Sequence, residues 1–267
     1  MRCCAMRAKY ILIFLLIVCT VALNAVVAVF GDTRDGYEIN GKIAAYIAAY
    51  QPTAVFHTGD LNTYGTSQKE YDRFHAINDP ITKVAPLYIA KGNHERNTQL
   101  FLLNFPILDG RTYYTVEHDS IVWIALDTTL KIGPGSEQYK WLQTQLESFQ
   151  GKPIFIFMHH PIFSSGKHGD ELGLNLYMPK LLQQYTVKAV FAGHDHGYER
   201  SELGGIYYIT TAGGGAPLYD NSSLNKQTVK FRKVNNYCIV ERTTTSIKVT
   251  AYDLNQQIID SFDVSLK

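Results

Sequence analysis

The stretch Val26-Val27-Ala28-Val29-Phe30-Gly31-Asp32 sets the pattern from which the rest of the chain can be interpreted. Its five apolar residues predict a buried strand, and Gly31 allows the chain to turn sharply before the carboxylate of Asp32. Residues 53–60 repeat the arrangement, because an apolar run there ends at Gly59 and Asp60. Each of these two predicted strands therefore carries a carboxylate at its carboxyl end.

Strand and helix patterns alternate through the first two thirds of the chain. Helices are predicted over residues 37–50, 67–77, 98–105, 136–149 and 174–185. Strands are predicted over residues 26–30, 53–57, 86–90, 153–158 and 187–192, with a hairpin formed by 113–116 and 121–126. Beyond Gly205 the pattern is all strand, over residues 206–211, 228–234, 237–241, 246–252 and 257–264. An α/β fold is expected, with parallel βαβ units followed by antiparallel strands in a single catalytic domain, residues 26–267.

The first 25 residues predict a targeting segment. Arg2, Arg7 and Lys9 precede the apolar run Tyr10–Leu23, as in the basic and apolar regions of a cleaved signal peptide. Because residues 26–30 are needed as a strand, only about 14 apolar residues remain, short of the roughly 20 that span a membrane. We expect an exported protein, secreted, periplasmic or lumenal. The alternative is an uncleaved or lipid-modified membrane anchor with the domain outside.

The composition excludes some partners. The formal net charge is +1, so no polyelectrolyte signature points to nucleic acid or to an anionic membrane surface. Hydrophobic residues make up 46% of the 267 residues, enough for a sizeable core. Three of the four cysteines lie at or before Cys19, so a disulfide framework is not expected.

Polar clusters with metal-ligand chemistry follow the apolar runs. They are Gly31-Asp32, Gly59-Asp60, Gly92-Asn93-His94-Glu95, His159-His160-Pro161 and Gly193-His194-Asp195-His196. Ligands of open α/β sheets gather at the carboxyl ends of strands, so we expect these clusters to converge. Carboxylate, amide and imidazole donors without thiolate suit iron, zinc or manganese better than calcium or copper. Two such ions about 3.5–4 Å apart can supply a metal-bound hydroxide for hydrolysis at phosphorus.

With these clusters the chain resembles the calcineurin-like metallophosphoesterase superfamily, and within it the purple-acid-phosphatase-like branch. The resemblance rests on longer motifs around the clusters: Gly31-Asp32-Thr33-Arg34, Gly59-Asp60-Leu61-Asn62-Thr63-Tyr64-Gly65, Gly92-Asn93-His94-Glu95, Met158-His159-His160-Pro161 and Gly193-His194-Asp195-His196. Similarity to the branch is added by Tyr198-Glu199-Arg200 and Gly213-Gly214-Gly215-Ala216-Pro217. The resemblance implies the metallophosphoesterase fold, a four-layer αββα sandwich of two mixed sheets flanked by helices.

The resemblance also implies roles for individual residues. Asp60 would bridge two metal ions. His94 would be an outer-sphere catalytic histidine, which stabilises the phosphoryl transition state or protonates the leaving oxygen. The remaining ligands would divide between the ions as follows: Asp32 and His196 on the first, and Asn93, His159 and His194 on the second.

Two positions depart from the pattern of the superfamily. Many members have a histidine two residues after the first aspartate, where this chain has Arg34, and a guanidinium cannot ligate a metal. Arg34 is expected either to contact a phosphate oxygen or to form a structural salt bridge. Purple acid phosphatases have a tyrosine three residues after the second aspartate, where this chain has Thr63. Either Tyr64 or water would then complete the first metal site.

Two further histidines are candidates for substrate binding. His168 lies in the Gly/Ser-rich loop of residues 164–169 and is expected to line a phosphate pocket, with a solvated turn as the alternative. His160 directly follows a predicted ligand. Its side chain is therefore expected to point away from the metal ions, with substrate contact as the alternative.

The predicted function is metal-dependent hydrolysis of small-molecule phosphate esters. An acid-phosphatase-like phosphomonoesterase is expected, working by in-line attack of a hydroxide bound to a dinuclear centre of iron, zinc or manganese. A phosphodiesterase acting on nucleotides or lipid head groups would use the same metal pair, and only pocket shape separates the two. A non-catalytic scaffold that keeps the fold for protein binding is the remaining alternative.

Overall fold

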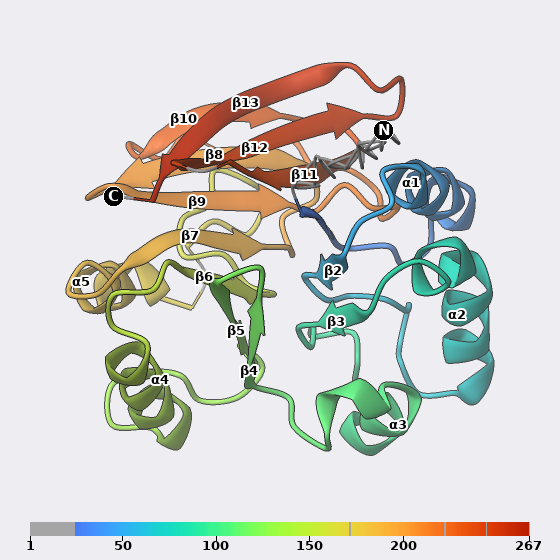
Figure 1. Ribbon diagram of the computed structural model, residues 1–267. Helices are drawn as coiled ribbons and strands as arrows, with labels where there is room; N and C mark the ends of the chain where they lie inside the picture. Colours follow the sequence, from blue (N-terminus) through green and yellow to red (C-terminus); the bar gives the residue numbers. More distant parts are fainter. Residues whose placement is uncertain (1–24, 171, 222, 244, 267) are drawn as a thin grey trace, which may run out of the picture.

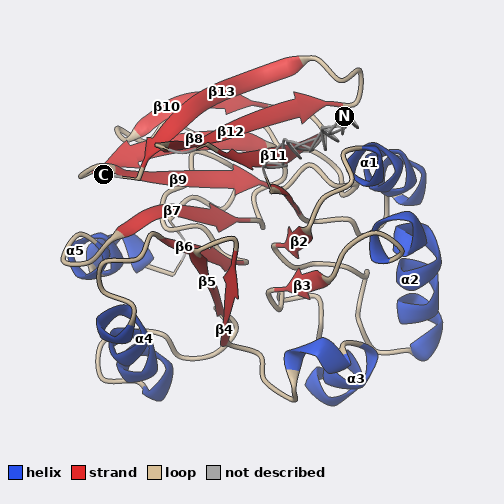
Figure 2. Cartoon of the chain, in the orientation of Figure 1, coloured by secondary structure: helices blue, strands red, loops and turns tan. Residues whose placement is uncertain are grey.

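The computed structural model describes residues 25–170, 172–221, 223–243 and 245–266, which form two mixed β-sheets with helices on their outer sides (Figure 1, Figure 2). The first sheet has six strands, in the spatial order β13 (Ile258–Ser265), β12 (Ser246–Asp253), β11 (Asn236–Arg242), β1 (Val26–Phe30), β2 (Ala54–His57) and β3 (Leu87–Ile89). The second has seven, in the order β10 (Thr228–Arg232), β8 (Tyr198–Leu203), β9 (Ile206–Thr211), β7 (Val187–Ala192), β6 (Ile154–Met158), β5 (Ile121–Leu126) and β4 (Tyr114–His118). The expected sandwich of two mixed sheets is confirmed.

Helices cover both outer faces of the sandwich. On the side of the first sheet lie α1 (Tyr37–Ala49) and α2 (Gln68–Thr82), and on the side of the second lie α4 (Glu137–Ser148) and α5 (Met178–Leu182) (Figure 1). The links from the first sheet to the second include α3 (Thr98–Asn104) and the 3₁₀ turn η1 (Pro106–Leu108). A second 3₁₀ turn, η2 (Leu174–Leu176), precedes α5. The four layers that the resemblance implies are therefore present.

Aromatic side chains fill the space between the two sheets. Phe56 of β2 stacks on Trp123 of β5 with ring centroids 3.9 Å apart, and Phe157 of β6 meets Phe56 edge-on at 5.0 Å. All three side chains are fully buried. Aromatic pairs of this kind contribute about 0.5–1.5 kcal/mol each beyond the burial of their area. This contact holds β2 of one sheet against β5 and β6 of the other.

The register of the parallel strands places the polar loops side by side. Phe30 of β1 pairs with His57 of β2, so the loops after these two strands are neighbours. Phe157 of β6 pairs with Phe191 of β7, which does the same for the loops after β6 and β7. The polar clusters lie in these loops and in the loop after β3. Residues distant in sequence are thereby brought to the same edge of the sandwich.

Some elements differ from the sequence prediction. The single helix expected over residues 174–185 is wrong, because the chain forms η2 and then starts α5 next to Pro179, which favours the first turn of a helix. Helix α2 runs to Thr82, beyond the predicted end at residue 77, and takes Pro80 into its last turn. Strand β8 was not predicted, although it lies between β10 and β9 in the second sheet.

The predicted targeting segment lies outside the described residues except for Ala25. Within the described part of the chain, every helix is too short or too polar to cross a membrane.

Candidate metal centre

The predicted ligand residues lie where loops from the two sheets meet. Carboxylate and imidazole atoms form two groups there, and within each group the candidate ligand atoms lie within 4.8 Å of one another. The first group is Asp32, Asp60 and His196, and the second is His159, His160 and His194. Asp60 also reaches the second group, because its Oδ1 atom lies 3.4 Å from Nε2 of His159. The two groups are therefore neighbours that share one carboxylate.

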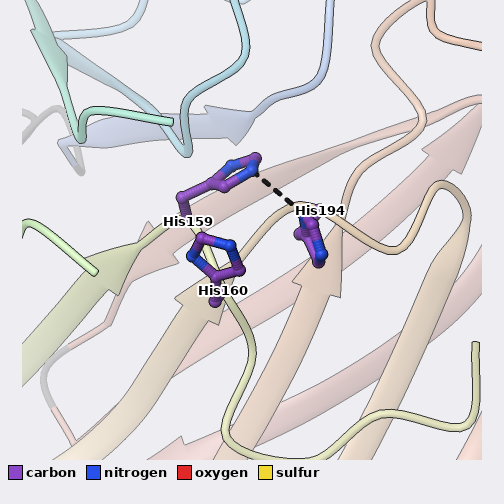
Figure 3. A group of neighbouring side chains, drawn as sticks. All are labelled: His159, His160 and His194. Atoms are coloured by element: carbon purple, nitrogen blue, oxygen red, sulfur yellow. Dashed lines mark hydrogen bonds between the residues drawn. The ribbon is translucent and has the colours of Figure 1, made fainter. Parts of the chain in front are cut away.

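The Nε2 atom of His159 is the centre of the second group. Oδ1 of Asn93 lies 2.7 Å from it and Nδ1 of His194 lies 3.2 Å from it, the latter drawn as a dashed line in Figure 3. Asn93 was predicted as a ligand of this ion together with the two histidines. Oxygen and nitrogen donor atoms from three loops thus converge, as the ligands of a single cation do.

Three histidines are oriented by backbone carbonyls. Nδ1 of His159 donates to the carbonyl of Thr58 at 3.0 Å, and Nδ1 of His196 donates to Pro217 at 2.7 Å. We assign the proton to Nδ1 because a carbonyl oxygen can only accept. The Nε2 atoms then carry lone pairs, which face the carboxylates. Metal-binding histidines are held in this way by hydrogen bonds from the second ring nitrogen.

The third such histidine is His94. Its Nδ1 atom donates to the carbonyl of Thr63 at 2.5 Å, and its Nε2 atom lies 3.8 Å from Oδ2 of Asp60. The backbone N–H of His94 also donates to Oδ1 of Asp60, at 3.0 Å. His94 is therefore close to both ligand groups without being a member of either, as expected of an outer-sphere residue.

The charge balance of the two groups fits bound cations. Burial raises the pKa of Asp32 well above its usual range, and the charge of Asp60 raises it further. Burial likewise raises the pKa of Asp60. Burial lowers the pKa of His159 and lowers that of His196 to about 3, so both rings are neutral. Burial thus disfavours the charged form of both carboxylates, and bound metal ions would offset that penalty.

The backbone is strained at three candidate ligands. Asp32, Asp60 and His194 have φ angles of 58°, 56° and 72°, in the left-handed region that costs about 1–2 kcal/mol for a residue with a side chain. Gly92 is required at its position, because a Cβ atom there would lie 2.2 Å from Oδ1 of Asp60. Strain of this kind concentrates at functional sites, where the surrounding structure holds it in place.

Glu95 organises the loop that carries Asp60. Its carboxylate is fully buried and accepts the backbone N–H groups of Asp60, Leu61 and Gly92 at 3.0, 3.0 and 2.9 Å. Burial raises the pKa of Glu95, and these N–H groups oppose that rise. The sequence motif contains Glu95, but no role was predicted for it, because two of its partners are the backbone N–H groups of Asp60 and Leu61, which lie 35 and 34 residues earlier in the chain.

A cavity of about 100 Å³ opens beside the two groups. Its walls combine predicted ligands with predicted substrate contacts: Arg34, Asp60, Asn93, His94, His168, His194, His196 and Tyr219. The ring of His168 lies 4.4 Å from that of His194. The backbone N–H of His168 donates to Oδ1 of Asp195 at 3.0 Å, so its loop is tied to the motif that supplies two candidate ligands.

Arg34 lies on the cavity wall and also forms ion pairs. Its Nη1 atom is 2.6 Å from Oδ2 of Asp35, and its Nε atom is 3.5 Å from Oδ2 of Asp60. Burial lowers the pKa of Arg34, whereas the carboxylates of Asp60 and Asp35 raise it, and the net shift is upward. Arg34 therefore forms a salt bridge, one of its two predicted roles, and also lines the cavity.

Tyr219 was missed by the sequence analysis. Its ring stacks on that of His196 at 4.2 Å, and it lines the cavity. The residue follows the Gly213-Gly214-Gly215-Ala216-Pro217 motif, which could have drawn attention to this loop.

Tyr64 and His160 differ in how they relate to the ligand groups. Tyr64 is 54% exposed, its ring lies 5.1 Å from the guanidinium of Arg96, and it does not line the cavity. His160 was expected to point away from the ligands, but its ring lies 4.3 Å from that of His194 (Figure 3). The reason is a 2.7 Å hydrogen bond between Nδ1 of His160 and the hydroxyl of Thr128, which turns the ring toward its neighbours.

The fold and the two ligand groups define the class of metallophosphoesterases. Residues 25–198 match the family model described as calcineurin-like phosphoesterase, so the chain belongs to that family. The resemblance inferred from the motifs is thereby confirmed.

Curated relatives place the chain near the purple acid phosphatases. "Probable inactive purple acid phosphatase 1" of Arabidopsis thaliana is 28% identical over 67% of this chain and 37% of its own length. Purple acid phosphatase 21 of the same plant is 26% identical over 59% of this chain and 42% of its own length. The chain thus spans about two fifths of the length of these relatives.

A solved structure agrees in fold. The purple acid phosphatase PPD1 from yellow lupin (Lupinus luteus) seeds has a TM-score of 0.79 at 18% identity, covering 91% of this chain and 54% of that chain. At this identity the match supports the fold alone.

Proposed function

We propose that the chain is a metal-dependent phosphoesterase that hydrolyses small phosphate esters, in the manner of an acid-phosphatase-like phosphomonoesterase. The observation that carries the proposal is the position of Asp60, whose carboxylate belongs to one ligand group and lies 3.4 Å from His159 of the other. Two metal ions drawn from iron, zinc and manganese would supply Lewis acidity and activate water at neutral pH.

The residues that would hold the ions are those of the two groups. Asp60 would be shared, and Asp32 and His196 would complete the protein ligands of the first ion. Asn93, His159 and His194 would hold the second, and the ring of His160 lies beside them. Arg34 occupies the place of a further ligand in many relatives, and Tyr64 is exposed. We therefore propose that water completes the first site.

His94 is proposed to act on the leaving oxygen of the ester. Its Nδ1–H is committed to the carbonyl of Thr63, and its Nε2 side reaches the cavity next to Asp60. When the ring is protonated on both nitrogens, its Nε2–H can donate a proton or a hydrogen bond to an oxygen in the cavity. Arg34 and His168 would contact the oxygens of the phosphoryl group, since both side chains line the same cavity.

We also propose that the protein is exported. The basic and apolar segment of residues 1–25 supports this, with a membrane-anchored form as the alternative. Comparing the mass of the secreted protein with that of the full chain tests it, because cleavage would remove about 25 residues.

Two other functions remain to be separated by experiment. A phosphodiesterase would use the same residues, so paired assays on an aryl phosphomonoester and its diester distinguish the two. A non-catalytic scaffold is suggested by the relative named "Probable inactive purple acid phosphatase 1" and by the similarity in fold to GAP50, the anchor in the inner membrane complex of Plasmodium. GAP50 has a TM-score of 0.77 at 17% identity, covering 91% of this chain and 89% of that chain.

Metal content measured beside hydrolysis decides between enzyme and scaffold. A purified protein that takes up transition metal and hydrolyses the monoester supports the proposal. A protein that binds no metal, and stays inactive after metal addition, would support the scaffold.

A further inference from the structure

Asp35 joins the two residues that depart from the pattern of the family. Its Oδ2 atom accepts a hydrogen bond from Nη1 of Arg34 at 2.6 Å, and its Oδ1 atom accepts one from the hydroxyl of Thr63 at 2.5 Å. Arg34 and Thr63 stand where relatives are expected to supply a further metal ligand. The chain has therefore replaced two ligand positions by one connected structure, which we call the Arg34–Asp35–Thr63 clamp.

The backbone holds the clamp in one geometry. The N–H of Arg34 donates to the carbonyl of Asp60 at 3.2 Å, so the turn is fixed to the residue at the centre of the site. Asp35 itself has a φ of 65°, in the left-handed region, which permits its carboxylate to reach both partners. Only 14% of the Arg34 side chain is exposed. The guanidinium is therefore a fixed charge at the cavity wall.

The clamp contacts two residues of the cavity wall. It holds Arg34, whose buried Nε atom has no hydrogen-bond acceptor and lies 3.5 Å from Oδ2 of Asp60. It also holds Thr63, whose carbonyl accepts the Nδ1–H of His94 at 2.5 Å. A single carboxylate thus controls the placement of a permanent cation and, through Thr63, of the proposed acid.

We propose that Arg34 is the specificity-determining residue that favours phosphomonoesters over phosphodiesters, and that Asp35 is its positioning residue. The inference rests on the proposed function. A monoester dianion carries one more negative charge and one more non-bridging oxygen than a diester. A guanidinium always carries its charge and presents a fork of N–H donors. It therefore binds the monoester more strongly, through both the extra charge and the extra oxygen. The small cavity, of about 100 Å³, also suits a compact phosphoryl group.

The test compares Arg34→Met, Asp35→Asn, Asp35→Ala and the Arg34→Met/Asp35→Ala double variant with wild type. Each is loaded with metal and assayed on an aryl phosphomonoester and the matching bis-aryl diester. Arg111→Met is the control, because Arg111 pairs with Asp109 at 3.5 Å on an exposed surface and is absent from the cavity wall. Metal content, a readout independent of turnover, and inhibition by inorganic phosphate are measured in parallel.

We expect Arg34→Met to lower kcat/KM for the monoester about 100-fold, mainly through KM, and to change the diester value less than about threefold. Asp35→Ala should raise the monoester KM about tenfold. The KM of Asp35→Asn should lie between those of wild type and Asp35→Ala, because the amide can keep one of the two hydrogen bonds. Adding Asp35→Ala to Arg34→Met should change the monoester KM little further. Metal content should stay at the wild-type value throughout, and phosphate inhibition should weaken in step with the monoester KM.

Two results distinguish failure of the inference about Arg34 from failure of the proposed function. If Arg34→Met retains metal and the monoester-to-diester ratio is unchanged, this inference is overturned while the proposed function stands. If the wild type binds no metal and hydrolyses neither ester, the proposed function fails and this inference fails with it.

Discussion

The Oδ1 atom of Asp60 lies 3.4 Å from the Nε2 atom of His159, although the two residues follow strands of different sheets. Asp60 also belongs to the ligand group of Asp32 and His196. One carboxylate therefore touches both groups, which is the relationship required of a ligand shared by two ions.

Replacing Asn93 by alanine removes the amide oxygen that lies 2.7 Å from Nε2 of His159. We expect the variant to bind about one metal ion fewer per chain and to hydrolyse phosphate esters at least about 100-fold more slowly, because the second ion loses a ligand. Metal analysis and a rate assay on the same sample check this. Asn255→Ala, at an exposed turn, is the control. Full metal content and full rate in Asn93→Ala would show that Asn93 is not a ligand.

His94→Ala should separate metal binding from chemistry. Metal content is expected to stay unchanged, because His94 is a member of neither ligand group. The rate should fall by about 10²–10⁴-fold if the ring assists the leaving oxygen. The loss should be larger for an alkyl phosphate than for a nitrophenyl phosphate, whose leaving group needs less protonation. An equal loss on both substrates would contradict the assignment of His94 as the proton donor.

Glu95→Gln tests the support of the Asp60 loop. Glutamine keeps one acceptor oxygen but has an NH2 group in place of the other, so the buried backbone N–H groups that this second oxygen of Glu95 accepts lose their partner. We expect the free energy of unfolding to fall by about 2–5 kcal/mol, measured by urea titration of the metal-free protein. Glu117→Gln, at an exposed ion pair with Lys152, should change it by less than about 1 kcal/mol. Equal changes in the two variants would refute the role of Glu95.

His57 should make stability depend on pH. Burial lowers the pKa of His57 to about 3, from a value near 6.5 in the unfolded chain. At a pH between these two pKa values, His57 is protonated in the unfolded state but not in the folded state. Stability therefore falls as pH falls below about 6.5, by up to about 1.4 kcal/mol per pH unit.

The variant His57→Asn isolates this effect, because the amide oxygen can still accept the N–H of Gly59 but does not titrate. The stability difference between wild type and variant should shrink as pH is lowered from 7 to about 4.5. A difference that stays constant over this range would mean that folding does not lower the pKa of His57.

The two-sheet sandwich was expected only from the resemblance to the metallophosphoesterase superfamily, but the convergence of the polar clusters could be predicted from the residues themselves. The reason is physical: apolar runs define the strands, and parallel strands bring their carboxyl ends to one edge. Asp32, Asp60 and His194 stood out because each follows a glycine at such an end. The apolar run and the glycine are local features of the sequence, so they can be recognised without knowing which distant residues each ligand contacts.

Features that depend on distant partners could not be predicted. Strand β8 contains Glu199, which is buried because Ser165 and Thr228 donate hydrogen bonds to its carboxylate. The sequence of β8 itself does not indicate these hydrogen-bond partners, and charged residues are uncommon in strands. Asp35 was missed for the same reason, since its contact with Thr63 requires a left-handed backbone that the sequence does not specify.

The most direct test of the account is metal content and phosphate-ester hydrolysis, measured side by side for wild type and Asp60→Ala. We predict about two transition-metal ions per wild-type chain and hydrolysis of an aryl phosphomonoester, with both lost in the variant, because Asp60 touches both ligand groups. An Asp60→Ala protein that keeps full activity would contradict the shared-ligand mechanism.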